Sequence, residues 1–193
     1  MPDLRRLFGT LLGLVLVAGI AFPSTAVYPS DHTVHSEAEL RAALLYNFAK
    51  FVDWPDKVFE APDAPVNLCV YGAETSAFAT ALRPLEGKLA RGRAVVVRTG
   101  VGREGLRDCQ VLFVPGRRER WLPEILGAAH ALHILTVGET EGFADSGGII
   151  GFVAVGDHQG FEINVAAARS ANLKISSQLL KLARVTNGRV DTQ

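Results

Sequence analysis

Apolar residues recur at steps of three to four positions in the first strongly patterned segment, which begins at Ser36. This spacing places them on one face and predicts a helix packed by that face. Glu39, three residues after Ser36, matches a capping box, and Pro55 predicts the end of the helix because it disfavours helical geometry in the residue before it. The apolar face consists of Leu40, Leu44, Phe48 and Phe51.

Short runs that are apolar throughout follow, separated by segments with helical spacing. Such runs predict strands of a parallel sheet that is covered on both faces. The predicted strands are 66–72, 94–98, 111–114 and 133–138, and the predicted helices between them are 76–85 and 121–129. Because each unit is short, we expect an α/β fold built as a small three-layer sandwich.

The pattern changes near the C-terminus, where 149–155 and 161–165 flank a turn rich in glycine at 156–160. Two strands joined by such a turn predict an antiparallel hairpin. We therefore expect a mostly parallel sheet that carries an antiparallel hairpin at its C-terminal edge.

Polar residues after the hairpin predict two further helices. Asn164 is suited to cap a helix that runs to 171, and Asn172 to end it in a left-handed conformation. Ser176 is suited to cap the last helix. The predicted inward face of that helix consists of Leu179, Leu182 and Val185.

The first 26 residues have the pattern of an export signal. Arg5 and Arg6 precede the apolar run Leu7–Phe22, and small residues offer cleavage after about Ala26. The run is shorter than the roughly 20 apolar residues of a membrane span. We expect 1–26 to be a cleaved signal peptide and the mature chain to be periplasmic; an uncleaved anchor is the alternative.

We expect 27–35 to be a flexible lead-in and 36–193 to form a single α/β domain. The chain has 20 basic and 20 acidic residues. This balance gives no electrostatic reason to expect binding to nucleic acid or to a membrane surface.

Cys69 and Cys109 are the two cysteines of the chain. An even number in an exported protein favours a disulfide, worth about 4 kcal/mol in the chain-entropy model. Two buried free thiols are the alternative. Zinc is disfavoured, since two thiolates do not complete a tetrahedral site.

Two motifs resemble catalytic or cofactor-binding ones. The segment Gly100–Gly105 matches GxGxxG, but too few residues follow it before the next strand for the helix that a dinucleotide site requires. Asp145–Gly148 matches the DSGG of trypsin-like proteases, but we find no base or double barrel to support it. We interpret the first as a connecting loop and the second as a turn whose small residues permit close backbone approach.

Four histidines form pairs, but no third ligand stands at a recognisable spacing from either pair. His130 and His133 flank the end of a predicted helix, and His32 and His35 lie in the lead-in, so we interpret them as surface residues. We expect no metal, no cofactor and no catalytic residue.

Several segments together resemble the YfiR family (HmsC-like) of bacterial periplasmic regulators. They are Leu45–Pro55, Ile134–Glu139, Gly147–Val153 and Phe161–Leu182, and the last, with its AAAR and LKISSQLL sequences, is the most specific. The resemblance covers nearly the whole chain after residue 26.

The resemblance implies a small α/β protein that dimerises and binds the periplasmic part of an inner-membrane diguanylate cyclase, holding it inactive. It further implies release by an OmpA-like, peptidoglycan-binding lipoprotein, and thereby control of cyclic di-GMP, exopolysaccharide and biofilm. Cys69 and Cys109 resemble one of two cysteine pairs of a characterised relative. The second pair would fall within Ala144–Gly151 and is missing here.

Three hypotheses follow from the sequence. The first is a non-enzymatic repressor that acts by binding, the second a small-solute-binding accessory module for transport or sensing, and the third an exported hydrolase. For the first, we predict a contact surface on the hairpin and the final helices. Its candidate partner-binding residues are Phe152, Phe161, Glu162 and Lys174.

Overall fold

A computed structural model describes residues 36–72, 77–116, 119–156 and 158–186. The predictions of a signal peptide at 1–26 and a lead-in at 27–35 fall outside these residues. Within the described ranges, no helix has the length and apolar character needed to cross a membrane.

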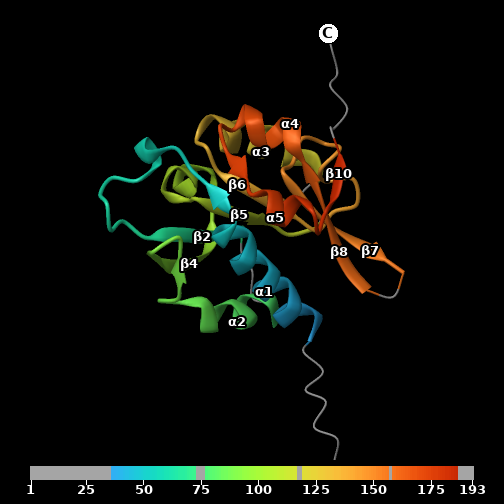
Figure 1. The fold of residues 1–193 in the computed structure, drawn as a ribbon, viewed down its shortest axis with the longest axis horizontal. Coiled ribbons are helices and arrows are strands. Elements are labelled where there is room, and N and C mark those ends of the chain that lie inside the picture. The colour runs from blue at the N-terminus through green and yellow to red at the C-terminus, as the bar shows by residue number, and fades with distance from the viewer. Residues whose placement is uncertain (1–35, 73–76, 117–118, 157, 187–193) are drawn as a thin grey trace, which may run out of the picture. The chain divides into compact units, whose positions relative to one another are not determined.

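The described residues form an eight-stranded sheet (Figure 1). Its strands, in order across the sheet, are β10 (Arg184–Thr186), β8 (His158–Asn164), β7 (Ile150–Val155), β6 (Leu135–Gly138), β5 (Val111–Val114), β2 (Val66–Tyr71), β4 (Arg93–Val101) and β3 (Leu89–Ala90). All neighbours are parallel except β7 with β8 and β3 with β4. A second, two-stranded antiparallel sheet pairs β1 (Val52–Asp53) with β9 (Lys174–Ile175).

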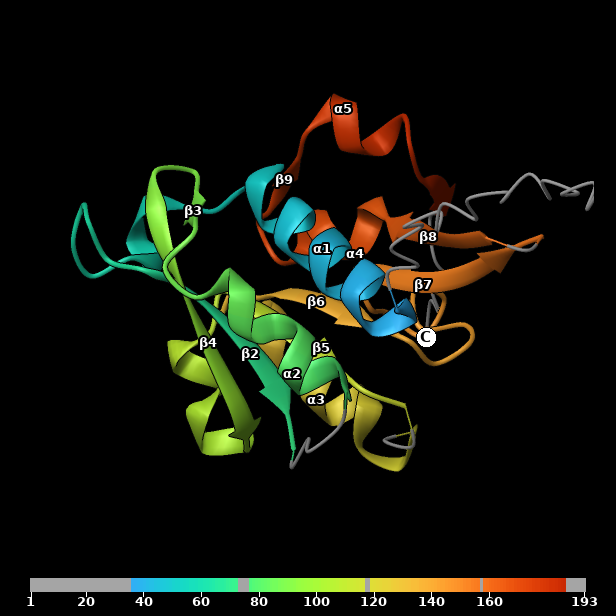
Figure 2. The same ribbon diagram turned by 90° about the horizontal axis from the view of Figure 1, so that it is seen from below.

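Helices cover both faces of the central strands. The α-helices are α1 (Glu37–Lys50), α2 (Ala77–Leu82), α3 (Leu122–Ala131), α4 (Val165–Ser170) and α5 (Ser177–Leu180), and the 3-10 helices are η1 (Asp56–Val58), η2 (Arg83–Leu85), η3 (Arg103–Asp108) and η4 (Glu119–Trp121). In Figure 1, α1 and α2 lie below the central strands and α3 above them, and Figure 2 shows α1 and α2 lying over the strands on one face. The expected three-layer α/β arrangement is confirmed.

Successive residues of the central strands point into two separate cores. Leu68 of β2 and Phe113 of β5 pack with α1 and α2 in the larger core. Cys69 and Leu112, their neighbours along the chain, pack with α3 and η3 in the smaller one. This alternation has the period of two that a strand imposes, and it explains why these runs are apolar throughout.

The predicted hairpin is present, but β10 pairs with the outer side of β8, so the hairpin is not the last element of the sheet. β6 pairs with β7 only at Ile150 and Gly151, and β10 pairs with β8 only from Glu162 onward. The rest of the hairpin, up to the pair Val155–His158, extends beyond the other strands (Figure 1).

The predicted helix caps are confirmed. The Ser36 hydroxyl accepts from the Glu39 amide at 3.2 Å, and the Glu39 carboxylate accepts from the Ser36 amide at 2.7 Å. The side chains of Asn164 and Ser176 cap α4 and α5. Asn172 has a φ of 56°, the left-handed conformation expected after α4.

Two predicted apolar faces are wrong in part. Leu40 is exposed, and α1 instead buries Ala42 and Leu45 beside Phe48, because its buried face is rotated relative to the apolar spacing. The last helix ends at Leu180, so only Leu179 of its predicted inward face is buried. The other two residues, Leu182 and Val185, are exposed, and Val185 belongs to β10.

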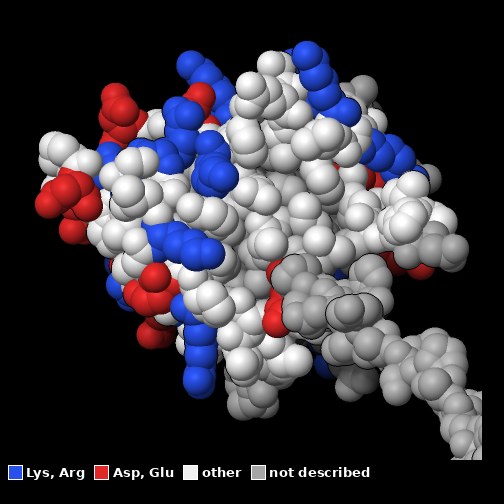
Figure 3. All heavy atoms as spheres, turned by 60° about the horizontal axis from the view of Figure 1, so that its bottom comes forward, with Lys and Arg blue, Asp and Glu red and all other residues white. Residues whose placement is uncertain are grey.

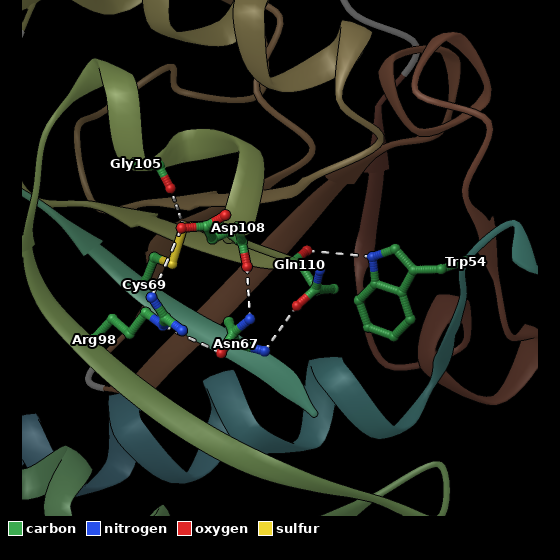
Figure 4. The surroundings of a disulfide bond; sticks show 8 residues. Trp54, Asn67, Cys69, Arg98, Gly105, Asp108 and Gln110 are labelled. Carbon is green, nitrogen blue, oxygen red and sulfur yellow. Dashed lines mark hydrogen bonds and ion pairs between the residues drawn. A yellow bond between two sulfur atoms is a disulfide. The ribbon is translucent and has the colours of Figure 1, made fainter. Parts of the chain in front are cut away.

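A disulfide joins Cys69 of β2 to Cys109, which follows η3, as predicted (Figure 4). It closes a separation of 40 residues. Beside it, buried Asn67 and Gln110 hydrogen-bond to each other: the backbone N–H of Asn67 donates to the side-chain Oε1 of Gln110 at 2.8 Å, and the backbone N–H of Gln110 donates to the backbone carbonyl of Asn67 at 3.0 Å. Pairing of this kind is needed because an unpaired polar group in a core is costly.

The Phe143 ring is fully buried between two glycines, Gly138 at the end of β6 and Gly148 before β7. A methyl group added to either glycine would overlap the ring. The small residues of Asp145–Gly148 thus permit close backbone approach, which confirms the interpretation of this segment as a turn.

We predict that Gly148→Ala lowers the free energy of unfolding by about 1–3 kcal/mol, the usual cost of overpacking a core. Gly127→Ala is the matched control, because Gly127 lies exposed within α3 with open space around it. The control should raise stability by about 0.5–1 kcal/mol, since glycine weakens a helix interior. Urea denaturation measures both; equal effects of the two variants would contradict the packing described.

Candidate functional site

A surface hollow of about 610 Å³ is lined by residues of α1, the loop after β6, the β7–β8 hairpin and β10. We call it the charged pocket. Glu139 enters it because it directly follows β6, and Glu37 and Arg41 enter it because they stand one helical turn apart on α1. Its charged residues are Glu37, Arg41, Glu139, Glu141, Asp145, Glu162 and Arg184.

Arg41 joins three of the elements around the charged pocket. Its guanidinium donates to Glu139 at 2.8 Å, to Glu37 at 2.5 Å and to Gln159 of the hairpin at 3.2 Å. It also lies over the Phe152 ring, 5.9 Å from the centroid. A planar guanidinium with this many acceptors is held in one orientation, so Arg41 fixes the hairpin against α1.

The acceptors of Arg41 are themselves held. The second oxygen of Glu139 accepts from the Gly116 amide at 2.8 Å, which ties the loop after β6 to the end of β5. The Gln159 amide donates to the carbonyls of Val153 and Gly160, each at 3.0 Å. This side of the pocket is therefore held in one arrangement by hydrogen bonds within the protein.

Glu162 is a buried carboxylate at the opposite side of the charged pocket, with a side chain that is 2% exposed. It stands in register between Gly151 of β7 and Arg184 of β10, and it forms an ion pair with Arg184. A Cβ on Gly151 would lie 3.1 Å from the carboxylate, so glycine leaves room for it. The Glu162 hydrogen bond and charge raise the pKa of Arg184, and the charge of Asp145 adds to this.

The charged pocket carries five carboxylates and two guanidinium groups, a net charge of −3 at neutral pH. Glu141 and Asp145 are exposed and form no ion pair with a described residue. The pocket is therefore suited to attract a cationic group.

Three of the four predicted partner-binding residues lie close together. The rings of Phe152 and Phe161 both pack against Phe48 of α1 in tilted arrangements, with centroids 5.9 and 4.9 Å from its own. Phe152 and Glu162 line the charged pocket. Lys174 lies apart from them in β9, opposite Asp53. Their role in partner binding stays a prediction.

Sequence reasoning missed Arg41, Glu139 and Arg184. The spacing of Glu37 and Arg41, four residues apart on a helix, signalled an ion pair but not the contact of Arg41 with Glu139, 98 residues further along the chain. Arg184 gave no signal, because β10 has only three residues and was predicted as part of a helix.

Of the other motifs and residues considered from the sequence, Asp145 of the Asp145–Gly148 segment lines the charged pocket, whereas the GxGxxG segment and the two described histidines of the pairs do not. The GxGxxG segment is the end of β4 followed by η3, a 3-10 helix of six residues. We predicted that His130 and His133 are surface residues, but both are half-buried. His133 Nδ1 lies 2.9 Å from the Ala171 carbonyl oxygen. Among the described residues, no group of three or more His, Cys, Asp or Glu could hold a metal ion.

His130 is unusual in that its buried Nε2 atom has no hydrogen-bond partner among the described residues. Burial lowers the pKa of His130, and a hydrogen bond with the backbone of Gly147 offsets this in part. The neutral ring is therefore favoured in the folded state.

Comparison with known proteins shows which family the chain belongs to. The model of the family described as YfiR/HmsC-like matches residues 38–184. No curated protein matches the chain. Among solved structures, the chain is similar to a conserved domain protein from Vibrio cholerae O1 biovar El Tor strain N16961, at 15% identity and a TM-score of 0.49. The match covers 78% of this chain and 60% of the Vibrio chain, less than two thirds of its length.

We predict that Arg184→Ala lowers the free energy of unfolding more than Arg103→Ala does. Removing Arg184 leaves the buried Glu162 carboxylate without its partner, whereas the Arg103–Glu124 pair is exposed on both sides. Adding Glu162→Gln to Arg184→Ala should restore part of the loss, because the amide carries no charge. Urea denaturation of the four proteins, wild type included, measures this; a double variant no more stable than Arg184→Ala would contradict it.

We also predict that His130 makes stability depend on pH. Because its folded-state pKa is lowered, the unfolded chain binds the proton first, so the free energy of unfolding falls as the pH drops below about 6.5. His130→Gln should reduce this fall, and His158→Gln, at an exposed position of β8, is the control. Denaturation between pH 5 and 8, in steps of about half a unit, tests it; identical profiles for the wild type and His130→Gln would show that His130 plays no part.

Proposed function

Because the chain belongs to the YfiR/HmsC-like family, we propose that it is a periplasmic regulator that acts by binding a protein partner and not by catalysis. Family membership supports a regulatory role in general. The proposed partner is the periplasmic region of an inner-membrane diguanylate cyclase, which the chain would restrain, lowering cyclic di-GMP. An OmpA-like lipoprotein would compete for the chain, and the chain itself would form a homodimer.

The charged pocket is the observation that carries this proposal. It combines a net charge of −3 with Glu141 and Asp145 at exposed positions, next to a hairpin that extends from the sheet. Complementary charge of this kind speeds encounter and selects the partner. The proposed contact is therefore a segment of the cyclase that carries Lys or Arg side chains.

The hydrogen bonds of Arg41 support the proposal because they hold the pocket in one arrangement. A pocket that is already ordered loses less conformational entropy on binding. A regulator can shift the equilibrium of its partner only by binding one conformation more tightly than another. A rigid pocket beside a projecting hairpin is suited to such discrimination.

The four predicted partner-binding residues have different positions in this proposal. Phe152 is buried, and Phe161 packs on the core, so they support the hairpin from within. Glu162 orders Arg184 at the edge of the charged pocket. Val155, 59% exposed near the hairpin tip, is an apolar contact available to a partner. Lys174 remains a separate prediction.

We predict that the exported chain lowers cyclic di-GMP in cells that contain its cyclase. The double charge reversal Glu141→Lys with Asp145→Lys should weaken binding to the periplasmic region of the cyclase about tenfold or more, because like charges then face each other. Glu104→Lys, an exposed residue of η3 outside the charged pocket, is the control. Binding is measured by calorimetry and cyclic di-GMP by a reporter.

A chain that lacks residues 1–26 separates export from binding, since it should leave cyclic di-GMP unchanged while still binding the cyclase fragment in vitro. The proposal is refuted if the exported chain binds no such fragment and leaves the reporter unchanged. If binding persists but both charge variants behave alike, the charged pocket is not the contact.

A further inference from the structure

A second surface hollow, of about 630 Å³, is lined by residues of β1, η1, the β3–β4 turn and β9. We call it the aromatic pocket because Trp54 and Phe59 both line it. It shares no residue with the charged pocket. Its volume lies within the roughly 300–1,000 Å³ of small-ligand sites.

Trp54 is anchored by a hydrogen bond to Gln110, which also pairs with Asn67 in the core. Its indole N–H donates to the Gln110 carbonyl at 3.2 Å (Figure 4), and its ring meets Phe59 edge-to-face with centroids 6.3 Å apart. Because the indole N–H is already used inside the protein, Trp54 offers the pocket an oriented apolar ring. Aromatic faces carry partial negative charge and attract the partly positive C–H groups of a ring lying on them.

Three cationic residues, Arg91, Arg93 and Lys174, line the same hollow. The Arg93 guanidinium stacks on Phe59 at 3.8 Å and uses one NH₂ group to hold the carbonyls of Ala61 and Ala64, leaving its other N–H groups without an acceptor among the described residues. Lys174 has no ion pair with a described residue, while Arg91 is paired with Asp53. On the side where Figure 1 places β2 and β4, Figure 3 shows Lys and Arg side chains gathered with some acidic ones.

Two further polar residues that line the hollow, Asp56 and Asn172, carry a carboxylate and an amide, which are groups suited to hydrogen-bond with hydroxyls. Asp56 is exposed without an ion pair to a described residue, and Asn172, held at a φ of 56°, brings an amide to the same hollow. A carboxylate accepts from hydroxyls and repels further anions, so this rim disfavours a ligand that concentrates more than one negative charge on a single group, as phosphate does. The lining has three cationic residues and two carboxylates, Asp53 and Asp56, so its net charge is +1. A ligand that fits it would carry one negative group, a ring to lie on Trp54, and hydroxyls.

We propose that the aromatic pocket binds an acidic saccharide, with a sugar ring on Trp54, its carboxylate facing Lys174 and Arg93, and its hydroxyls on Asp56 and Asn172. A flat aromatic acid would use the ring and the cations but leave the hydroxyl-binding groups without partners. A neutral saccharide would leave Lys174 and Arg93 without an anionic partner. The proposed ligand is the class that satisfies all three sets of groups, and its site shares no residue with the charged pocket proposed as the cyclase contact.

Trp54 fluorescence provides the test. The chain has two tryptophans, and Trp121 is exposed outside the pocket, so exported Trp121→Phe protein reports on Trp54 alone. Trigalacturonic acid should give a saturable change in emission. Maltotriose, benzoate and inorganic phosphate, tested at the same concentrations, should bind at least about tenfold more weakly.

Variants separate recognition from folding. Lys174→Gln should weaken trigalacturonate binding about fivefold, as loss of one exposed ionic contact does, whereas Lys181→Gln, at an exposed lysine directly after α5, should not. By calorimetry, Trp54→Leu should abolish binding and Trp54→Phe should retain it, with circular dichroism confirming the fold of both.

The proposal is overturned by any of three results: no saturable change with trigalacturonate, equal or tighter binding of maltotriose, benzoate or phosphate, or equal affinities for Lys174→Gln and Lys181→Gln. None of these results bears on cyclase binding, which is measured separately at the charged pocket.

Discussion

Burial of the central strands on both faces is the constraint on which the rest of this structure depends. Strands β2, β5 and β6 are parallel neighbours; β2 and β5 send alternate residues into two different cores, and β6 contributes Leu135 and Val137 to the larger one. A sheet of this kind is stable only when helices cover both of its faces. The disulfide and the Asn67–Gln110 pair lie at this central position, where every polar group must find a partner inside the protein.

Both surface pockets lie at the margins of this covered region. The charged pocket forms where the hairpin extends beyond β6 and β10 and Arg41 ties it back to α1. The aromatic pocket forms at the small β1–β9 sheet, where Trp54 is anchored to Gln110 at the margin of the central sheet. The packed core thus orders polar and aromatic groups at the surface of both pockets.

The sequence predicted the elements whose signals are local. The four apolar segments predicted as strands are β2, β4, β5 and β6, and side chains suited to capping did cap helices. It failed for β1, β3, β9 and β10, which have two or three residues each and exist only because a neighbouring strand pairs with them. It also failed at Leu40 and Leu182, because apolar spacing does not say which part of a face meets the core.

The sequence by itself determined the α/β class, the hairpin, the cysteine pair and the family, since each depends on residue type and spacing along the chain. It also indicated Phe152 and Glu162 as residues of interest. Only the tertiary structure decided that Glu162 is buried against Arg184, and that Arg41 meets Glu139 and Gln159. These contacts join residues 22, 98 and 118 positions apart, and no local pattern encodes a meeting that depends on how the whole sheet closes.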